Sequence, residues 1–454
     1  MQKTVVINIV GLSKSILPLM PFVNRYAAQH RLRIIEPMLP AVTTAVQTTY
    51  LTGKWPSETG IVGNGWYDRT DSEVKFWKQS NHLVQSKKIW EAAKEADPSF
   101  TCSNMFWWYN MYSSVDYSAT PRPNYLADGR KIPDCYTHPA SLRDTLQQEL
   151  GTFPLFQFWG PGANIKSSQW IANAAVKTDR QHHPTLTLIY LPHLDYCLQK
   201  FGPEAASIKN ECLEMDGVVQ QLVRYYDEQN TRIILLSEYG IAPVSNPIHL
   251  NRILRSKGYL AVREERGLEL LDAGASKVFA VADHQIAHIY IADKQQIPEI
   301  KSLFENTDGI AGVLDKAGQV NGHIHHERSG DLVLIAAGNS WFTYYFWEDD
   351  KRAPDYARCV DIHKKPGYDP VELFMTSKLR AAYKLLKKKL GMRYVMDVIP
   401  LDASLVKGSH GSPFVEDDYK PVLITKNGTA TQQVRATEVR ATDIYDIIWQ
   451  HLCS

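Results

Sequence analysis

The chain lacks several features that would place it in a special class. No stretch of its 454 residues approaches the roughly 20 apolar residues that a membrane-spanning helix needs. Neither sign of charge dominates, because 50 Lys and Arg balance 49 Asp and Glu. No bulk field therefore attracts nucleic acid or an anionic membrane. The sequence also has no internal repeat and no low-complexity tract. We expect neither a membrane nor a nucleic-acid polymer as a partner.

Cysteine is scarce as well. The six cysteines lie far apart in the chain, and none belongs to a Cys-x-x-Cys pair. In a chain of this length, that pattern is typical of reduced thiols and not of a disulfide framework. The apolar run at residues 5–10 is too short for a signal-peptide core, and Lys14 follows it without a small-residue cleavage site. We expect a cytoplasmic protein. The composition says nothing about its oligomeric state.

Apolar runs that alternate with helical patterns predict an α/β fold. Residues 5–10, 185–191 and 232–236 are short and continuous, as in strands buried on both faces of a parallel sheet. Between the last two runs, apolar residues recur at spacings of 4, 3, 4, 3 and 4 from residue 208 to residue 226, which predicts a long helix. Strand, helix and strand in this order indicate a parallel sheet with right-handed crossovers.

Polar residues that follow strands of such a sheet gather along its carboxyl edge, where open α/β sheets bind their ligands. Thr43, Asp195 and Glu238 are the candidates in this sequence. The sequence pattern changes at residues 262–347, where short apolar runs flank one expected helix near residues 296–305. We therefore expect an α/β core at residues 1–261 and 348–454, with an inserted α+β cap at 262–347. An amphipathic segment at 377–390 ends in Lys387-Lys388-Lys389, which we interpret as a solvated helix face.

The most informative motif lies at residues 39–64. It places Thr43 at an expected helix start, followed by Thr52-Gly53, Pro56, Gly60-Ile61 and Asn64. This pattern resembles the nucleotide pyrophosphatase/phosphodiesterase branch of the alkaline-phosphatase superfamily. The resemblance implies a three-layer α/β/α sandwich with a mostly parallel central sheet and an inserted α+β cap. It also implies that Thr43 is the nucleophile and that Asn64 binds phosphate.

Further segments extend the resemblance over most of the chain. Residues 190–203 resemble the family's Pro-Asp-x-x-Gly-His-x-x-Gly-Pro segment, residues 237–241 its Ser-Asp-His-Gly-Met, and residues 408–411 its last metal-binding His-Gly. Blocks at 154–161 and 365–370 resemble a bacterial group within the superfamily. The family binds two metal ions, usually zinc. The resemblance places the ligands of one ion at Asp195, Gln199 and His410.

The sequence departs from the family at the second ion. Its four ligand positions fall on Val10, Thr43, Glu238 and Tyr239. Valine cannot coordinate a metal, and tyrosine is a poor ligand at neutral pH. The remaining set of Asp195, Gln199 and His410 is rich in oxygen, so it suits Mg²⁺ or Mn²⁺ at least as well as Zn²⁺. We expect fewer metal ions than the family's two.

Two interpretations stay open. In the first, new ligands from the cap rebuild the site around one ion. The candidates are Asp283, His284, His288, His323, His325, His326 and, beyond the cap, His363. In the second, the metal machinery is lost, and a pseudoenzyme binds a phosphorylated metabolite or a partner. The aromatic run at 106–112 fits either a substrate-stacking surface or packing beneath the cap.

The function that the sequence favours is metal-dependent hydrolysis of a phosphodiester or phosphomonoester of a small molecule. Thr43 would attack phosphorus and form a phospho-threonine intermediate, and Glu238 would act as general base. Asn64 and Tyr239 would bind the substrate, while Asp195, His410 and Gln199 would hold a divalent ion. A phosphoryl transferase or mutase is a further alternative within the superfamily. The sequence does not name the substrate.

Overall fold

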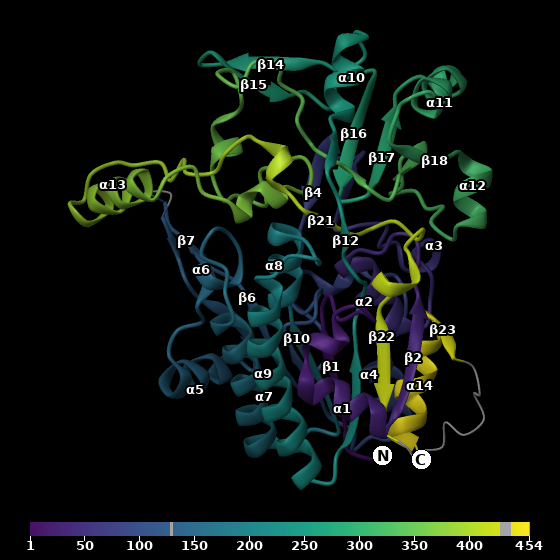
Figure 1. Ribbon diagram of the computed structural model, residues 1–454, viewed down its shortest axis with the longest axis vertical. Coiled ribbons are helices and arrows are strands. Elements are labelled where there is room, and N and C mark those ends of the chain that lie inside the picture. Colours follow the sequence, from purple (N-terminus) through teal and green to yellow (C-terminus); the bar gives the residue numbers. More distant parts are fainter. Residues whose placement is uncertain (128–129, 427–436, 454) are drawn as a thin grey trace.

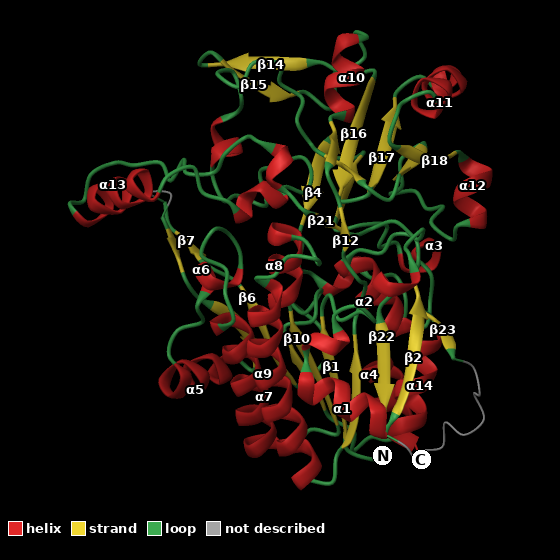
Figure 2. Ribbon diagram, in the orientation of Figure 1, coloured by secondary structure: helices red, strands yellow, loops and turns green. Residues whose placement is uncertain are grey.

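The computed structural model describes residues 1–127, 130–426 and 437–453. Its centre is a nine-stranded sheet with the order β23-β2-β22-β11-β1-β10-β5-β6-β9 (Figures 1 and 2). The strands are β1 (Thr4–Ile9), β2 (Arg31–Glu36), β5 (Cys102–Met105), β6 (Tyr117–Pro121), β9 (Cys135–His138), β10 (Leu186–Leu191), β11 (Arg232–Leu236), β22 (Val422–Thr425) and β23 (Glu438–Arg440).

Most neighbouring strands in this sheet are parallel, as the sequence predicts. β1 lies between β10 and β11 and pairs with both in parallel, so Ile7 is opposite Ile189 and Leu235. Every residue of β1 is buried, which explains its continuous apolar run. β22 is antiparallel to β11 and β2, and β9 is antiparallel to β6.

Helices cover both faces of the sheet, which makes the expected three-layer α/β/α sandwich. On one side, α7 (Lys166–His182) packs against β10 and β5, and α9 (Ile208–Glu228) packs against β11. On the other side, α14 (Asp443–Cys453) packs against β1 and contacts α2 (Thr43–Thr52). The apolar stripe predicted for residues 208–226 is the buried face of α9. The helical expectation at this position is confirmed.

Shorter elements connect these layers. α8 (His193–Phe201) follows β10 directly and packs against α9. The other core helices are α1 (Pro21–Gln29), α3 (Pro56–Thr59), α4 (Ile89–Ala96), α5 (Ala140–Leu150) and α6 (Leu155–Phe158). Small two-stranded sheets are β3 (Gly65–Asp68) with β4 (Glu73–Phe76), β7 (Asn124–Tyr125) with β8 (Lys131–Ile132), and β12 (Ala242–Pro243) with β21 (Gly408–Ser409).

A second sheet lies above the carboxyl edge of the first (Figure 1). It is antiparallel, with the order β16-β17-β19-β18. Its strands are β16 (Val278–Asp283), β17 (Ile286–Ile291), β18 (Ile310–Leu314) and β19 (Leu332–Ala336), and α10 (Leu250–Ser256), α11 (Ile297–Glu305) and α12 (Lys316–Asn321) surround it. The strands and the helix expected between residues 278 and 336 are therefore present. The domain boundaries at residues 261 and 347 stay a prediction.

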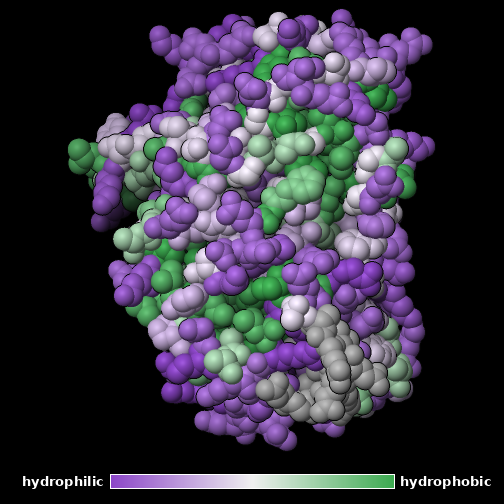
Figure 3. Space-filling model, turned by 45° about the vertical axis from the view of Figure 1, so that its right-hand side comes forward, coloured by the Kyte–Doolittle hydropathy of each residue, from purple (hydrophilic) through white to green (hydrophobic). Residues whose placement is uncertain are grey.

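The hydrophobic interior divides in the same way. One buried cluster belongs to the large sheet and its helices, and a second holds the inner side chains of the small sheet. The second cluster begins at Val244 and ends at Val406, apart from Phe76, so its packing reaches beyond residues 262–347. On the face shown in Figure 3, polar residues cover most of the periphery and hydrophobic residues reach the surface in patches across the middle.

Candidate functional site

Thr43 is the first residue of α2 and lies in the interior of the protein. Each of the ten side chains of α2 is buried. The helix has no side-chain cap of its own at Val42. Instead, the amide N–H of Thr44 donates to Oδ1 of Asn64 at 3.1 Å. Asn64 therefore satisfies one of the free amides at the helix start, where a phosphate group would also bind.

The amide group of Asn64 is also tied to the cap. Its Nδ2 donates to Oδ1 of Asp283 at 3.0 Å, and its backbone N–H donates to Oδ2 of the same residue at 2.8 Å. Burial raises the pKa of Asp283 to about 6, against the lowering effect of the two bonds from Asn64. Asn64 thus joins the helix start to the cap. Asp283 takes one of the two N–H groups of the Asn64 amide, which leaves the second as a donor for a ligand.

Tyr239 links Thr43 to Asp195. The Tyr239 hydroxyl lies 2.9 Å from Oγ1 of Thr43 and donates to Oδ1 of Asp195 at 3.4 Å. The ring of Tyr239 stacks on the ring of His410 with 3.6 Å between centroids and 7° between planes. These four side chains come from four distant segments, and each is at most 5% exposed. The fold therefore brings together the residues that the sequence motifs single out.

Glu238 also lies near Thr43. Its Oε1 accepts hydrogen bonds from Nδ2 of Asn8 at 2.5 Å and from Nε2 of Gln47. Its Oε2 has no hydrogen-bond partner among the described residues. Burial raises the pKa of Glu238 to about 8, although the bonds from Gln47 and Asn8 favour its ionised form.

His410 and Asp195 have the geometry that one metal ion requires. Nδ1 of His410 lies 2.8 Å from the carbonyl oxygen of Ala41, which can only accept, so Nδ1 carries the proton. Nε2 then keeps its lone pair, and it has no partner among the described residues. Oδ1 of Asp195 lies 3.7 Å from this nitrogen. Histidine ligands of metals typically have one ring nitrogen hydrogen-bonded to the protein and the other free to bind the ion. These residues fit the first ion of the family.

Gln199 belongs to the same side of α8 as Asp195, one helical turn later. Its Oε1 accepts a hydrogen bond from the Tyr368 hydroxyl at 2.9 Å, while its Nε2 has no partner in the described part of the chain. Burial raises the pKa of Asp195 to about 7, while the nearby Gln199 amide and the hydrogen bond from Tyr239 favour its ionised form. A divalent ion would supply the positive charge that this carboxylate lacks.

The second ion of the family does not fit. The side chain of Val10 is fully buried and has no donor atom. The hydroxyl of Tyr239 lies between Thr43 and Asp195 and hydrogen-bonds to both. A neutral phenol thus stands at a position expected to hold a ligand of the second ion, and it links Thr43 to Asp195, a residue of the first-ion set.

Among the cap histidines, His284 contacts the first-ion residues. Its ring lies 3.8 Å from that of His410 and 3.5 Å from that of Tyr368, between centroids. Its Nδ1 lies 2.8 Å from Oδ1 of Asp283, and its Nε2 has no partner among the described residues. Burial holds the pKa of His284 well below its usual range. His284 is therefore a neutral imidazole with a free lone pair at the edge of the site.

The remaining histidine candidates are engaged elsewhere or exposed. His288 donates from Nε2 to the carbonyl of Val62 and accepts at Nδ1 from the N–H of Gly330. His323 stacks on Trp55, His326 bonds Gln85, His363 bonds the carbonyl of Phe76, and His325 is exposed.

A different group of side chains, on the opposite side of α8, also has metal-ligand spacing. His193, Cys197 and Glu211 bring one ligand atom each within 4.8 Å of the other two. The described residues contain one such cluster of His, Cys, Asp and Glu, and it lies toward α9, not toward Thr43. Nε2 of His193 lies 2.8 Å from Oε2 of Glu211 and 3.5 Å from Sγ of Cys197. We call the side chains around Thr43 described above, including the metal candidates Asp195 and His410, the Thr43 site. A measurement of bound metal has to distinguish that site from the His193 cluster.

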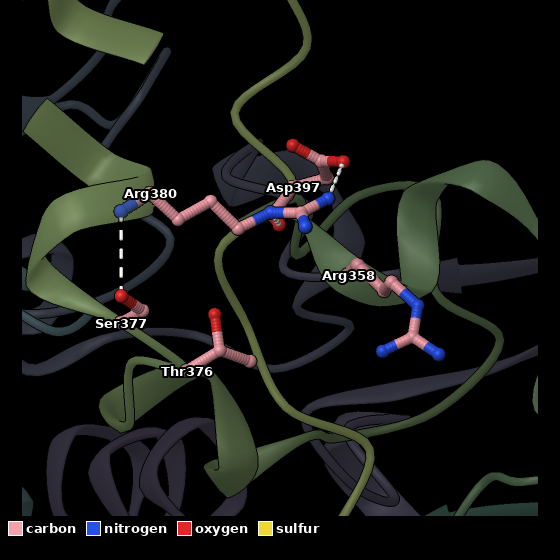
Figure 4. Close-up of a pocket in the computed structure, with 5 residues that line it drawn as sticks. All are labelled: Arg358, Thr376, Ser377, Arg380 and Asp397. Carbon is pink, nitrogen blue, oxygen red and sulfur yellow. Dashed lines mark hydrogen bonds and ion pairs between the residues drawn. The ribbon is translucent and has the colours of Figure 1, made fainter. Parts of the chain in front are cut away.

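A surface cavity of about 430 Å³ lies elsewhere in the fold (Figure 4). It is lined by Arg358, Thr376, Ser377, Arg380 and Asp397. Figure 4 shows Arg380 turned toward Asp397, with which it forms an ion pair. None of the residues that line this cavity belongs to the Thr43 site.

Sequence patterns missed three residues of the Thr43 site. Gln47 is one turn after Thr43 on α2, and this spacing is a signal that could have found it. Asn8 is a polar residue inside the apolar run of β1, which is a second signal. Tyr368 gives no signal in the sequence, because only the tertiary structure places its hydroxyl on Gln199.

Comparison with known structures supports the fold. Murine ectonucleotide pyrophosphatase/phosphodiesterase 5, solved as an inactive variant in complex with AMP, is 13% identical and aligns with a TM-score of 0.60 over 100% of this chain and 95% of that chain. Phosphonoacetate hydrolase from Sinorhizobium meliloti, in complex with phosphonoformate, is 14% identical, with a TM-score of 0.61 over 99% of this chain and 95% of that chain.

Sequence comparisons agree with the structural ones. An uncharacterized pyrophosphatase/phosphodiesterase of Schizosaccharomyces pombe is 24% identical over 220 residues, which cover 46% of this chain and 38% of the yeast protein. The chain thus matches a little over a third of that relative's length. The family model for type I phosphodiesterase / nucleotide pyrophosphatase matches residues 4–369, which is most of the chain. The chain therefore belongs to the type I phosphodiesterase / nucleotide pyrophosphatase family.

Proposed function

We propose that the protein is a hydrolase of phosphodiester or phosphomonoester bonds in a small molecule, with Thr43 as nucleophile. One observation carries this proposal: a buried hydroxyl at a helix start lies among polar atoms that have no partner in the described part of the chain. These atoms are Oε2 of Glu238, Nε2 of Gln199, Nε2 of His284 and Nε2 of His410. Unpaired buried polar groups are costly, so their occurrence on side chains that contact one another from Thr43 to Gln199 favours a bound ligand.

The proposed reaction begins with attack of Thr43 Oγ1 on phosphorus. The new Oγ1–P bond forms as the ester P–O bond breaks, and the leaving oxygen takes up a proton. Water then cleaves the phospho-threonine and regenerates the hydroxyl. Amides at the start of α2, together with the second N–H of the Asn64 amide, would bind the transferred group.

Two carboxyl groups could accept the proton of Thr43. Glu238 would do so directly, whereas Asp195 would do so through the Tyr239 hydroxyl. We assign the role of general base to Glu238, because Asp195 faces the free nitrogen of His410 and is needed for the metal. A carboxyl group with a pKa near 8 is well matched to proton transfer near neutral pH. Tyr239 would orient the Thr43 hydroxyl and the substrate.

Asp195 and His410 would hold one divalent ion, with Gln199 as a further oxygen ligand. When bound, the ion would polarise the phosphoryl oxygens as a Lewis acid. His284 is the cap residue that could join this set. We do not propose a second ion, since Val10 and Tyr239 cannot hold it.

Turnover of p-nitrophenyl phosphate and bis(p-nitrophenyl) phosphate, with added Mg²⁺, Mn²⁺ or Zn²⁺, tests the proposal and separates monoesterase from diesterase activity. Thr43→Ala should abolish turnover but keep binding of AMP, whereas Thr43→Ser should retain part of the activity because it keeps a hydroxyl. Full turnover in Thr43→Ala would refute the role of Thr43.

The metal is tested by elemental analysis of the purified protein and of two single variants. Asp195→Ala should lose the ion that supports turnover. Cys197→Ser is the matched control on the same helix, because it removes a ligand from the His193 cluster and leaves Asp195 in place. If only Cys197→Ser loses metal, the ion belongs to that cluster and the proposed site is wrong.

The alternative is a pseudoenzyme that binds a phosphorylated metabolite or partner without hydrolysing it. The side chains of Val10 and Tyr239 favour it, because valine offers no ligand for the second ion of the family and the Tyr239 hydroxyl is hydrogen-bonded to Thr43. Such a protein would bind AMP or a related phosphate in both wild type and Thr43→Ala, and it would show no turnover with any of the three metals.

A further inference from the structure

The helix α13 (Lys378–Lys389) stands away from the rest of the molecule (Figures 1 and 2). None of its side chains is buried. Ion pairs of Arg380 and Lys384 with Asp397 hold one side of the helix against the returning chain. The half-buried residues Ala381, Lys384 and Lys387 recur every three residues and mark this inner side.

The opposite side of α13 carries an apolar stripe. Leu379, Tyr383, Leu386 and Leu390 recur at spacings of 4, 3 and 4, so they lie on one helix face. Their exposed fractions are 84%, 54%, 53% and 64%. Because the inner side is fixed by Asp397, this apolar stripe points to solvent and not toward the protein. An exposed apolar stripe of this kind marks an interaction surface.

Basic residues flank the stripe. Residues 373–396 contain seven basic side chains and no acidic one, although the chain as a whole has a formal net charge of only +1. The seven are Lys378, Arg380, Lys384, Lys387, Lys388, Lys389 and Arg393. On a helical projection, Lys378 and Lys389 lie on one side of the stripe and Arg380 and Lys387 on the other. The charge is therefore local and surrounds the apolar stripe.

We propose that α13 lies flat on the surface of an anionic lipid bilayer. Its apolar stripe would enter the boundary between headgroups and acyl chains, and the flanking cations would pair with lipid phosphates and carboxylates. The occupant is a bilayer because the stripe is presented on a projecting, convex helix with cations on both sides, which matches a planar anionic surface. Within the described residues, no helix has the length and apolarity to span a membrane, so this contact is peripheral.

Vesicle co-sedimentation tests the proposal with the full chain. The protein should sediment with vesicles of about three parts phosphatidylcholine to one part phosphatidylserine, but not with phosphatidylcholine alone, and raised salt should weaken binding. Leu379→Ser combined with Leu386→Ser should lower the partition coefficient more than about tenfold. Lys378→Gln combined with Lys389→Gln, which removes both cations on one side of the stripe, should lower binding to the anionic vesicles alone.

Val320→Ser is the matched control, because Val320 is 52% exposed on α12, a helix of the cap. It should bind vesicles like the wild type. All these residues are exposed, so unfolding midpoints and ester hydrolysis should stay unchanged. Equal binding to neutral and anionic vesicles would overturn the electrostatic argument. No binding to either, with a dimer that the Leu379/Leu386 variant converts to monomer, would show that a second copy covers the stripe instead.

Discussion

Replacement of Tyr239 by phenylalanine isolates a single hydroxyl at the centre of the site. The side chain is 1% exposed, and its oxygen lies 2.9 Å from Oγ1 of Thr43. Phenylalanine keeps the ring that stacks on His410. Loss of a buried hydrogen bond should lower the free energy of unfolding by about 1–2 kcal/mol. Because Thr43 loses the partner that orients it, kcat should fall about 100-fold.

Urea unfolding and steady-state ester hydrolysis measure the two effects. Tyr344→Phe is the control: Tyr344 is fully buried, but its hydroxyl makes no hydrogen bond to the described residues. This control should leave both kcat and stability close to the wild type. A Tyr239→Phe variant with kcat within about twofold of the wild type would refute the orienting role of the hydroxyl.

Three further predictions concern charge and close packing. Burial raises the pKa of Glu238 from 4.5 to about 8, so the folded state holds this proton more tightly, and with a chelator present Glu238 should lower stability by on the order of 1 kcal/mol per pH unit between these values. Glu238→Gln should remove this contribution in urea unfolding, most clearly between pH 7 and 8, above the raised pKa values of Asp195 and Asp283. An unchanged pH dependence in that range would contradict the prediction. Lys365 forms buried ion pairs of 2.7 and 2.6 Å with Asp369 and Glu372, so Lys365→Met should cost about 3–5 kcal/mol in the same assay, and a loss below about 1 kcal/mol would contradict this. A Cβ atom on Gly240 would lie 1.6 Å from a backbone carbonyl oxygen. Gly240→Ala should therefore lower the thermal unfolding midpoint and reduce the free energy of unfolding by more than about 2 kcal/mol. An unchanged midpoint would disprove the close approach.

The Thr43 site shows how substitutions within one family site can act together. Val10 has no side-chain atom that could coordinate a metal, and the Tyr239 hydroxyl hydrogen-bonds to both Thr43 and Asp195. A back-substitution pair, Val10→Asp with Tyr239→His, would return both donors at once. If the pair binds two ions per chain at the Thr43 site where the wild type binds one, these two positions account for the difference in metal content.

Local patterns were sufficient to predict the architecture. The continuous apolar run of β1 reflects burial of the strand on both faces, and the spacing along α9 reflects burial of one helix face. Both kinds of burial produce a pattern among neighbouring residues that can be recognised in the sequence. The same holds for Thr43 and Asn64, whose fixed separation belongs to one continuous motif. The sequence alone therefore determined the fold class, the family resemblance and the position of the candidate nucleophile.

The tertiary structure decided which side chains meet. His284 and His288 lie four residues apart, yet one keeps a free nitrogen beside His410 and the other has both nitrogens occupied. Likewise, only the tertiary structure shows that Asp283 holds one of the two N–H groups of the Asn64 amide. Such pairings depend on contacts between segments about 200 residues apart, and on the competition among them for each hydrogen-bonding atom, which no local pattern encodes.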